Sequence, residues 1–357
     1  MRILQIIDSL EVGGAERMAV NYANALAEKI SFSGLIATRR EGALKSQIGA
    51  SVDYLFLNKK MAFDIQAAFR LRAYCKKNRI GILHAHGTSF FLAFLLKLIH
   101  SDIKIVWHEH KGARSSEGIK NNKILWLCSR FFAGIIVVDH MLEVWCQSML
   151  QFKNVIYLPN FTLLEKNILA LTILEGENHK RILCLANLRY PKNHQLLIAV
   201  AARVKLIFPQ WTFHLVGNDF ADAYSTALRD NIRKHSLEET VYIYGLREDT
   251  GPIIDQAEIA VLTSISEGLP LALLEYGLHK KAVVATHVGE IPLIIENGKN
   301  GFIVPSENEI LFYEALIELI RSRELRIAFG ESLFQTIMQD HSKKAIVDQY
   351  LEWLPTL

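Results

Sequence analysis

The stretch Ile259-Ala-Val-Leu-Thr-Ser-Ile-Ser-Glu-Gly-Leu-Pro-Leu-Ala-Leu-Leu-Glu275 carries the strongest structural signal in the chain. Its apolar beginning, 259–263, predicts a buried strand. Gly268 marks a turn, and Pro270 suits the first position of the helix predicted over 271–278, where its missing N–H costs nothing. The stretch therefore predicts a strand that passes through a short loop into a helix.

The same alternation of strand and helix patterns extends along the whole chain. The apolar runs that predict strands are 2–7, 34–38, 80–84, 103–107, 134–138, 181–186, 212–216, 241–244, 258–262, 282–285 and 301–304. The amphipathic stretches between them include 15–29, 63–78, 194–207 and 310–321. This alternation predicts an α/β fold in which parallel sheets are wrapped by helices.

The length of 357 residues fits two domains of ordinary size. Pro159-Asn160 is a turn signal, and the polar stretch 175–180 precedes a new strand pattern. We therefore predict one domain over 1–162 and a second over 163–340, with a final helix in 341–357.

Two carboxylates in the opening stretch, Glu267 and Glu275, suggest a ligand. Glu267 falls in the predicted loop at the helix N-terminus, where free backbone N–H groups can bind a phosphate. Glu275 falls about one and a half turns into the helix. Carboxylates accept hydrogen bonds from sugar hydroxyls, so the combination suggests a nucleotide-sugar. The alternative is that both are solvated surface residues.

Two further loops could contact phosphates. Gly13-Gly14 opens the first helix and lets the backbone approach a ligand closely, although a plain tight turn explains it equally well. It is not a G-x-G-x-x-G fingerprint, so nicotinamide binding is disfavoured. Arg189 and Lys192 follow the strand at 181–186 and could clamp a diphosphate, or they are solvated charges.

Histidines follow two strands of the first half, in His84-Ala-His86 and His108-Glu-His110. Their spacing of two places the rings of each pair on the same side. Both a metal site and a set of polar cleft residues fit this pattern, but there is no H-E-x-x-H helix.

Composition bounds the function further. No run of 18 apolar residues and no signal peptide is visible, and four scattered cysteines favour free thiols in a cytoplasmic protein. Residues 1–164 hold 21 Lys and Arg against 12 Asp and Glu, whereas the remainder holds 19 against 25. Pairs such as Arg39-Arg40 and Lys59-Lys60 favour an anionic membrane surface, and ordinary surface decoration is the alternative. Nothing indicates nucleic-acid binding.

Glu267-Gly-Leu-Pro-Leu-Ala-Leu-Leu-Glu275 resembles the E-x7-E motif of the retaining GT-B glycosyltransferases of family 4. The resemblance extends over nearly the whole chain. It implies two Rossmann-like domains facing across a cleft, with the acceptor on the first and the nucleotide-sugar on the second. It also implies that the final helix returns to the first domain.

The family's site residues map onto this chain by motif. The resemblance implies catalytic roles for His110, Glu267, Arg189 and Lys192, and a cleft position for His86 and, less directly, His108. The donor-binding residues it implies are Gly13, Gly14, Gly217, Gly245, Gly268, Leu269, Pro270, Leu271 and Glu275. The chain departs from the family pattern at Glu290 and Leu293, where a Gly and a Glu are usual.

The resemblance leads to a specific functional expectation. We expect a metal-independent enzyme without a cofactor, because the D-x-D motif of metal-bridged enzymes is missing from the sequence. A UDP-sugar is the expected donor, with a GDP-sugar as the alternative, and the acceptor is a glycan or lipid-linked glycan in bacterial surface polysaccharide synthesis. The expected place of action is the cytoplasm, at the inner membrane face. A nucleotide-sugar epimerase and an inactive assembly partner are the rival functions.

Overall fold

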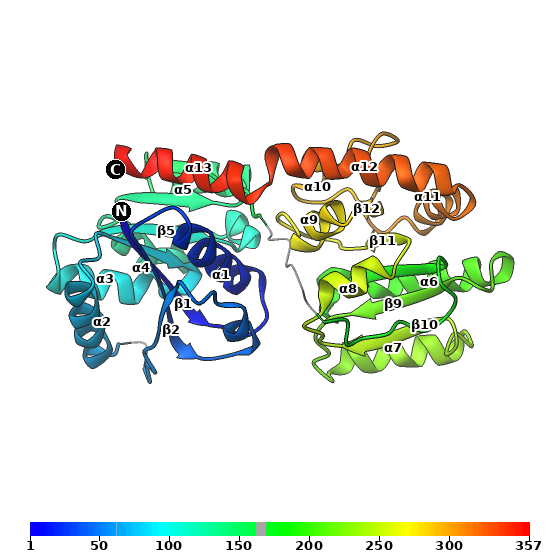
Figure 1. Ribbon diagram of the computed structural model, residues 1–357, viewed down its shortest axis with the longest axis horizontal. Coiled ribbons are helices and arrows are strands. Elements are labelled where there is room, and N and C mark those ends of the chain that lie inside the picture. Colours follow the sequence, from blue (N-terminus) through cyan, green and yellow to red (C-terminus); the bar gives the residue numbers. More distant parts are fainter. Residues whose placement is uncertain (62, 162–168) are drawn as a thin grey trace. The chain divides into compact units, whose positions relative to one another are not determined.

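The computed structural model describes residues 1–61, 63–161 and 169–357. It contains two compact units, Met1–Thr162 with Lys343–Leu357, and Leu163–Ser342 (Figure 1). The predicted boundary between residues 162 and 163 itself lies outside the described residues. The segment that joins the first unit again begins at Lys343, two residues after the predicted 341.

The first unit is built on a parallel sheet with the strand order β3-β2-β1-β4-β5-β6-β7. The strands are β1 (Arg2–Ser9), β2 (Phe32–Arg40), β3 (Asp53–Phe56), β4 (Ile82–His86), β5 (Lys104–Glu109), β6 (Gly134–Val137) and β7 (Val155–Tyr157). The helices are α1 (Gly14–Ala27), α2 (Ile65–Lys77), α3 (Phe90–Ile99), α4 (Lys123–Ser129), α5 (His140–Met149) and α13 (Lys343–Trp353).

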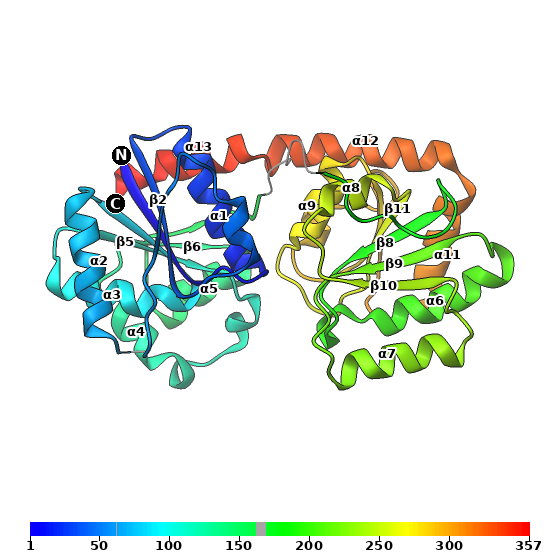
Figure 2. The same cartoon turned by 60° about the horizontal axis from the view of Figure 1, so that its bottom comes forward.

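Helices cover both faces of this sheet because its strands are apolar on both sides. Leu4 and Ile6 of β1 pack with α2, α3, α4 and α5, whereas Ile7 packs with α1 on the other face. Helix α13 lies beside α1, where the Tyr22 and Tyr350 rings are 5.3 Å apart (Figure 2). The C-terminal helix is therefore part of the first unit's core.

The second unit repeats the plan with the strand order β10-β9-β8-β11-β12-β13. The strands are β8 (Arg181–Leu185), β9 (Thr212–Val216), β10 (Val241–Gly245), β11 (Ile259–Leu262), β12 (Ala282–Thr286) and β13 (Phe302–Val304). The helices are α6 (His194–Ile207), α7 (Ala223–Lys234), α8 (Thr250–Asp255), α9 (Leu271–Leu278), α10 (Ile291–Ile294), α11 (Glu309–Arg321) and α12 (Arg323–Asp340). Helices α6, α7 and α11 pack on one face, and α8, α9, α10 and α12 on the other.

All pairs of neighbouring strands run parallel, so the predicted α/β class with parallel sheets is confirmed. In each sheet the order reverses once, between β1 and β4 and between β8 and β11. Such switch points open a crevice at the carboxyl ends of the strands, where ligands bind in open α/β sheets. Both crevices are therefore candidate ligand sites.

Several boundaries differ from the sequence prediction by one to a few residues, and two strands are additional. Strands β3 and β7 were not predicted, because they are short edge strands whose apolar pattern is weak. Pro270 is not the first residue of α9 but the residue before it, with φ −71° and ψ 125°. Asp139 caps α5, because its carboxylate accepts a hydrogen bond from the Leu142 N–H at 2.7 Å.

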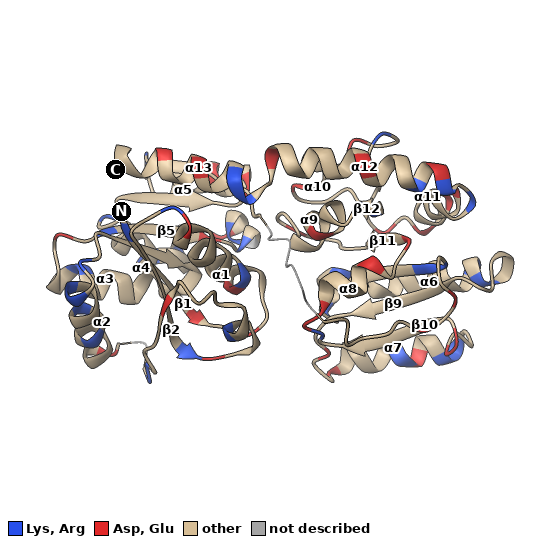
Figure 3. Cartoon of the chain, in the orientation of Figure 1, with Lys and Arg blue, Asp and Glu red and all other residues tan. Residues whose placement is uncertain are grey.

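The structure also bears on the predictions for the cysteines, for membrane-spanning helices and for the basic residues. The four cysteines are free and buried. Among the described residues no helix is both long and apolar enough to cross a bilayer. Basic side chains gather on α2 (Figure 3). The assignment of Lys59 to a basic surface is wrong, because its side chain is only 2% exposed.

Candidate functional site

The switch point of the second sheet brings together two of the predicted catalytic residues. Lys192 ends the 3-10 helix Tyr190–Lys192 that follows β8, and Glu267 lies in the loop between β11 and α9. The Lys192 ammonium donates to Glu267 Oε1 at 2.5 Å, and the Ser264 hydroxyl donates to the same oxygen at 2.6 Å. Both charged side chains are largely buried, with 15% and 10% of their surface exposed. The carboxylate and the ammonium are therefore held in fixed positions.

Backbone contacts lock the two loops to each other. The Ile265 N–H donates to the Pro191 carbonyl at 2.9 Å, and the Thr263 hydroxyl donates to the Lys192 carbonyl at 2.8 Å. These contacts join segments that are about 70 residues apart in the sequence. The sequence did not indicate a role for Thr263 or Ser264. Their hydroxyls reach Lys192 and Glu267 only because the fold brings the two loops together.

The start of α9 is held by a neighbouring loop. Glu290 donates its N–H to the Gly268 carbonyl at 3.1 Å. Gly289 has φ +55°, and a Cβ there would lie 2.3 Å from the Glu267 carbonyl oxygen, so only glycine fits. Glu275 is the fifth residue of α9 and is buried, with 8% exposure. The departure from the family pattern at Glu290 thus retains the backbone contact that supports Glu267.

The remaining candidates of the second unit lie along the same edge of its sheet. Arg189 precedes the 3-10 helix, and its side chain is exposed, with no ion pair to any residue that the structure describes. Gly217 follows β9 and Gly245 ends β10, and the Gly217 N–H donates to the Gly245 carbonyl at 3.1 Å. A Cβ on Gly217 would lie 2.1 Å from the Ala186 carbonyl oxygen. This edge therefore offers exposed positive charge and closely approachable backbone.

The residues that follow Glu267 lead from the loop into helix α9. Leu269 is buried in the core beneath the loop, and Leu271 begins α9. Helix α9 begins four residues after Glu267, and in its first turn the Leu273 N–H donates to the Pro270 carbonyl at 3.1 Å, which leaves the N–H groups of Leu271 and Ala272 without an acceptor in the helix. An anion at this place would meet a helix N-terminus and two cationic side chains, Arg189 and Lys192.

In the first unit the predicted cleft histidines form a buried network. His86 Nδ1 lies 2.9 Å from His110 Nε2, and His84 Nε2 lies 3.1 Å from His108 Nδ1. The two pairs stack on each other, with ring centroids 4.4 Å apart for His84 and His86 and 3.9 Å apart for His108 and His110. Gln5 Oε1 occupies the other nitrogen of His86 at 2.8 Å. The network ties the carboxyl ends of β4 and β5 together.

The histidine network does not favour a metal ion. His84, His86 and His108 offer nitrogen atoms within 4.8 Å of one another. However, each hydrogen-bonded pair forms one layer, and His86 has no lone pair left for a metal ion, because its Nδ1 is hydrogen-bonded to His110 and its Nε2 to the Gln5 side-chain oxygen. The arrangement instead suits hydrogen bonds along each layer.

Burial keeps these imidazoles neutral. It lowers the pKa of His110 to about 3, and the pKa values of His86 and His108 are also lowered well below the ordinary value, with the neighbouring histidines as a further cause. A neutral ring has one donor and one acceptor nitrogen. His110 therefore supplies no positive charge, and because its Nε2 is bonded to His86, its buried Nδ1 is the nitrogen left to contact a ligand.

The glycines of the first unit lie at the start of α1. Gly13 precedes the helix in an extended conformation, and a Cβ there would lie 2.2 Å from a Glu16 carboxylate oxygen. Gly14 is exposed and has open space around it. The Glu16 carboxylate thus folds back onto the N-terminus of α1, and a phosphate contact of Gly13 and Gly14 stays a prediction.

Family models match both halves of the chain. A model described as "Glycosyltransferase Family 4" matches residues 12–165, and one described as "Glycosyl transferases group 1" matches residues 179–322. An uncharacterized glycosyltransferase of Haemophilus influenzae is 23% identical over 95% of both chains. A UDP-Gal:alpha-D-GlcNAc-diphosphoundecaprenol alpha-1,3-galactosyltransferase of Escherichia coli is 22% identical over 88% of this chain and 87% of its own length.

Solved structures show the same fold. The crystal structure of Anabaena HepE in complex with UDP and glucose superposes with a TM-score of 0.81 over all of both chains, at 18% identity. This likeness agrees with the two parallel sheets described above and identifies the fold as GT-B.

Proposed function

The chain belongs to the group 1 glycosyltransferases, and we propose that it is a retaining enzyme that transfers a sugar from a UDP-sugar to a lipid-linked glycan. The observation that carries this proposal is the Lys192–Glu267 pair at the switch point of the second sheet. It places a fixed cation and a helix N-terminus, which suit a diphosphate, next to a fixed hydroxyl acceptor, which suits a sugar.

We assign the donor contacts as follows. Arg189 and Lys192 bind the diphosphate together with the free N–H groups of α9. Glu267 accepts a hydrogen bond from the transferred sugar, and Glu275 accepts hydrogen bonds from the ribose. Gly217 and Gly245 leave room for the nucleotide. A UDP-sugar is the preferred donor, since the structural neighbour HepE was solved with UDP and glucose, and a GDP-sugar is the alternative.

The reaction proposed for this site is substitution on the front face of the sugar. The bond between the anomeric carbon and the diphosphate breaks while the acceptor oxygen attacks from the same side. The departing phosphate oxygen accepts the acceptor's proton, so no protein base is required. Lys192 and Arg189 stabilise the charge that develops on the diphosphate. His110, kept neutral by burial, orients the donor sugar by hydrogen bonding.

The names of the relatives support a proposal for the acceptor. The Escherichia coli relative is named for an acceptor on diphosphoundecaprenol. We propose that this chain likewise extends a lipid-linked glycan during bacterial surface polysaccharide synthesis and works at a membrane surface. The excess of Lys and Arg in residues 1–164, 21 against 12 acidic residues, supports contact with an anionic surface.

The proposal is tested by following UDP release and the product. The purified protein is incubated with a panel of UDP- and GDP-sugars, with and without a glycosyl-diphospho-lipid acceptor, and the anomeric configuration of the new linkage is determined by NMR. We expect acceptor-dependent release of UDP and retention of configuration. Conversion of the free nucleotide-sugar without acceptor would support an epimerase instead, and an inverted product would refute the retaining mechanism.

A further inference from the structure

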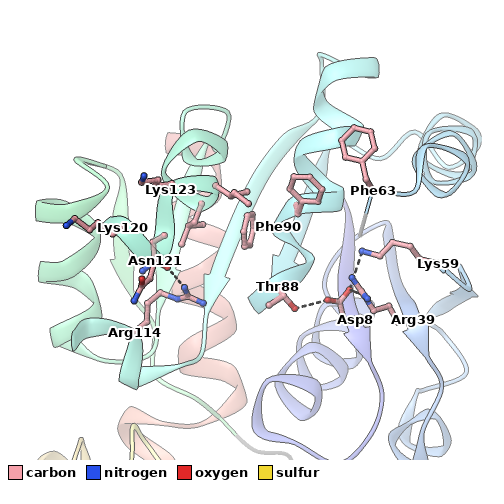
Figure 4. Close-up of a pocket in the computed structure, with 14 residues that line it drawn as sticks. Asp8, Arg39, Lys59, Phe63, Thr88, Phe90, Arg114, Lys120, Asn121 and Lys123 are labelled. Carbon is pink, nitrogen blue, oxygen red and sulfur yellow. Dashed lines mark hydrogen bonds and ion pairs between the residues drawn. The ribbon is translucent and has the colours of Figure 1, made fainter. Parts of the chain in front are cut away.

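The first unit contains a pocket of about 720 Å³ that none of the roles above uses. Its walls come from the carboxyl ends of five adjacent strands, β3, β2, β1, β4 and β5, and from the segments that follow them. It therefore lies at the switch point between β1 and β4. Asp8 at the end of β1 accepts a hydrogen bond across this crevice from the Thr88 hydroxyl at 2.7 Å (Figure 4).

One wall of the pocket holds more positive than negative charge. Lys59 and Arg39 both face Asp8, with nitrogen-to-oxygen distances of 3.9 Å and 3.6 Å. Both distances are long for hydrogen bonds, and among the described residues the Lys59 ammonium has no closer carboxylate. Burial lowers the pKa of Lys59, and Asp8 opposes that shift. Two cations thus share one carboxylate inside a pocket.

The opposite wall is also basic. Arg114 is held by Glu109 and by the Asn122 side chain, so its charge is balanced. Lys120 and Lys123 line the pocket as well, are exposed, and have no ion pair within the described part of the chain. Figure 4 shows Arg114, Lys120 and Lys123 across from Asp8, Arg39 and Lys59. In this view the ammonium groups of Lys120 and Lys123 point away from Asp8, so the cations that a ligand would meet are Arg39 and Lys59 on one wall and the charge-balanced Arg114 on the other.

The rest of the lining is apolar and continues beyond the pocket. Phe63, Phe90, Phe91, Ile124 and Leu125 line it. The ring centroids of Phe63 and Phe91 are 6.1 Å apart, those of Phe91 and Phe94 are 6.3 Å apart, and those of Phe94 and Phe131 are 5.0 Å apart. We call these four phenylalanines the aromatic row. Phe63 is 58% exposed and Ile124 is 63% exposed, so both present apolar surface that a ligand in the pocket could cover.

We propose that this pocket binds the acceptor, and that the acceptor is an amphiphile whose phosphate or diphosphate contacts Lys59 and Arg39 and whose apolar chain lies along the aromatic row. This assignment rests on the proposed transferase function. Cations in a partly buried site favour a phosphate, which carries more charge and more acceptor oxygens than a carboxylate. The volume of about 720 Å³ suffices for a phosphorylated group and the beginning of a chain, and the row extends outward for the remainder.

The proposal is tested by calorimetry on the full chain with three probes below their aggregation limits: farnesyl diphosphate, inorganic pyrophosphate and farnesol. We expect farnesyl diphosphate to bind at least about tenfold more tightly than either of the others, because it alone fills both halves of the pocket. Pyrophosphate binding as tightly as farnesyl diphosphate would mean a site for free phosphates, and equal binding of farnesol would mean an apolar site; either result overturns the proposal.

Variants locate the binding. Lys59→Met and Arg39→Gln should each weaken farnesyl diphosphate about tenfold to hundredfold, since each removes one charge-assisted contact, and Phe63→Ala should weaken it about tenfold. If the variant of the buried Lys59 does not fold, the Arg39 variant still tests the proposal. The Arg39 side chain is 42% exposed, so its substitution should disturb folding less. The matched control is Lys104→Met, an exposed lysine at the amino end of β5, which should bind like the wild type.

UDP titrated into the same samples separates this proposal from the proposed function. UDP affinity should be unchanged in all four variants, because the proposed donor contacts lie in the second unit. Farnesyl diphosphate affinity that is unaltered in the Arg39 and Phe63 variants would overturn the pocket assignment even with UDP bound normally. Failure of the wild type to bind UDP would instead refute the donor site.

Discussion

Replacing Lys192 with methionine keeps most of the side-chain volume and removes the charge that pairs with Glu267. A preorganised charge stabiliser of this kind typically contributes roughly 10²–10³-fold to turnover. We therefore expect kcat to fall about 10²–10³-fold with a smaller change in KM, because the ammonium acts most strongly once charge develops on the departing diphosphate.

The same substitution affects stability through Glu267. The carboxylate is 10% exposed and would retain the Ser264 hydroxyl as a donor after the ammonium is lost. Loss of one partner of a buried charged group costs about 1–3 kcal/mol. For a unit of this size each kcal/mol shifts Tm by about 2–4 °C, so we expect a decrease of about 2–12 °C. Adding Glu267→Gln removes the stranded charge and should restore most of the Tm but none of the turnover.

The assay combines steady-state release of UDP with thermal melting of the same preparations. Lys299→Met is the matched control, because Lys299 forms an ion pair with Glu296 at 2.8 Å with both side chains about two-thirds exposed. Such surface pairs contribute little, so this variant should match the wild type in both measurements. A Lys192→Met enzyme with a kcat within twofold of the wild type would refute the role of Lys192 at the diphosphate.

Three further predictions concern metal, pH and the membrane. Turnover should persist in excess EDTA, since cationic side chains and N–H groups balance the diphosphate; loss of activity restored by Mg²⁺ or Mn²⁺ would contradict this. The folded-state pKa of His110, about 3, lies below its ordinary value of 6.5, so its contribution to stability is complete above about pH 6.5 and is lost as pH falls toward 3. His110→Asn should therefore flatten the fall of Tm below pH 6.5, and an unchanged slope would refute the buried neutral ring. The protein should sediment with anionic vesicles at low salt, with about 1 kcal/mol per nearby basic residue, and a variant in which Arg40, Lys60, Lys76 and Lys77 are neutralised should do so less; equal, negligible sedimentation of both would mean that these charges only solvate the surface.

Much of the fold could be predicted because the signals are local. The helix of residues 194–207 and the strand of residues 212–216 have the predicted boundaries, since a buried parallel strand is a continuous apolar run and a packed helix is amphipathic. The short strands β3 and β7 were missed for the same reason: Asp53–Phe56 and Val155–Tyr157 lie at the sheet's two edges and bury few residues on either face.

The sequence could identify candidate residues of the site, but it could not show which of them contact each other. Lys192 and Glu267 are 75 residues apart, and no local pattern indicates that they pair. Lys59 and Lys60 look alike in the sequence, yet one lies inside a pocket and the other on the surface, and the Lys59 N–H donates to the Thr38 carbonyl of β2, a contact between distant segments that no local pattern indicates. The layered histidines likewise depend on the register that places His84 beside Val106 and His86 beside His108.

The central claim, that the switch point of the second sheet binds a nucleotide-sugar, is tested most directly by calorimetric titration of UDP and of the preferred UDP-sugar into the wild type, Glu275→Ala and Glu267→Ala. If Glu275 holds the ribose, its alanine variant should bind UDP about tenfold or more weakly. If Glu267 holds the sugar and not the nucleotide, its variant should bind UDP normally and lose only the additional affinity for the sugar. Equal loss of UDP affinity in both variants, or normal UDP binding by Glu275→Ala, would contradict the account.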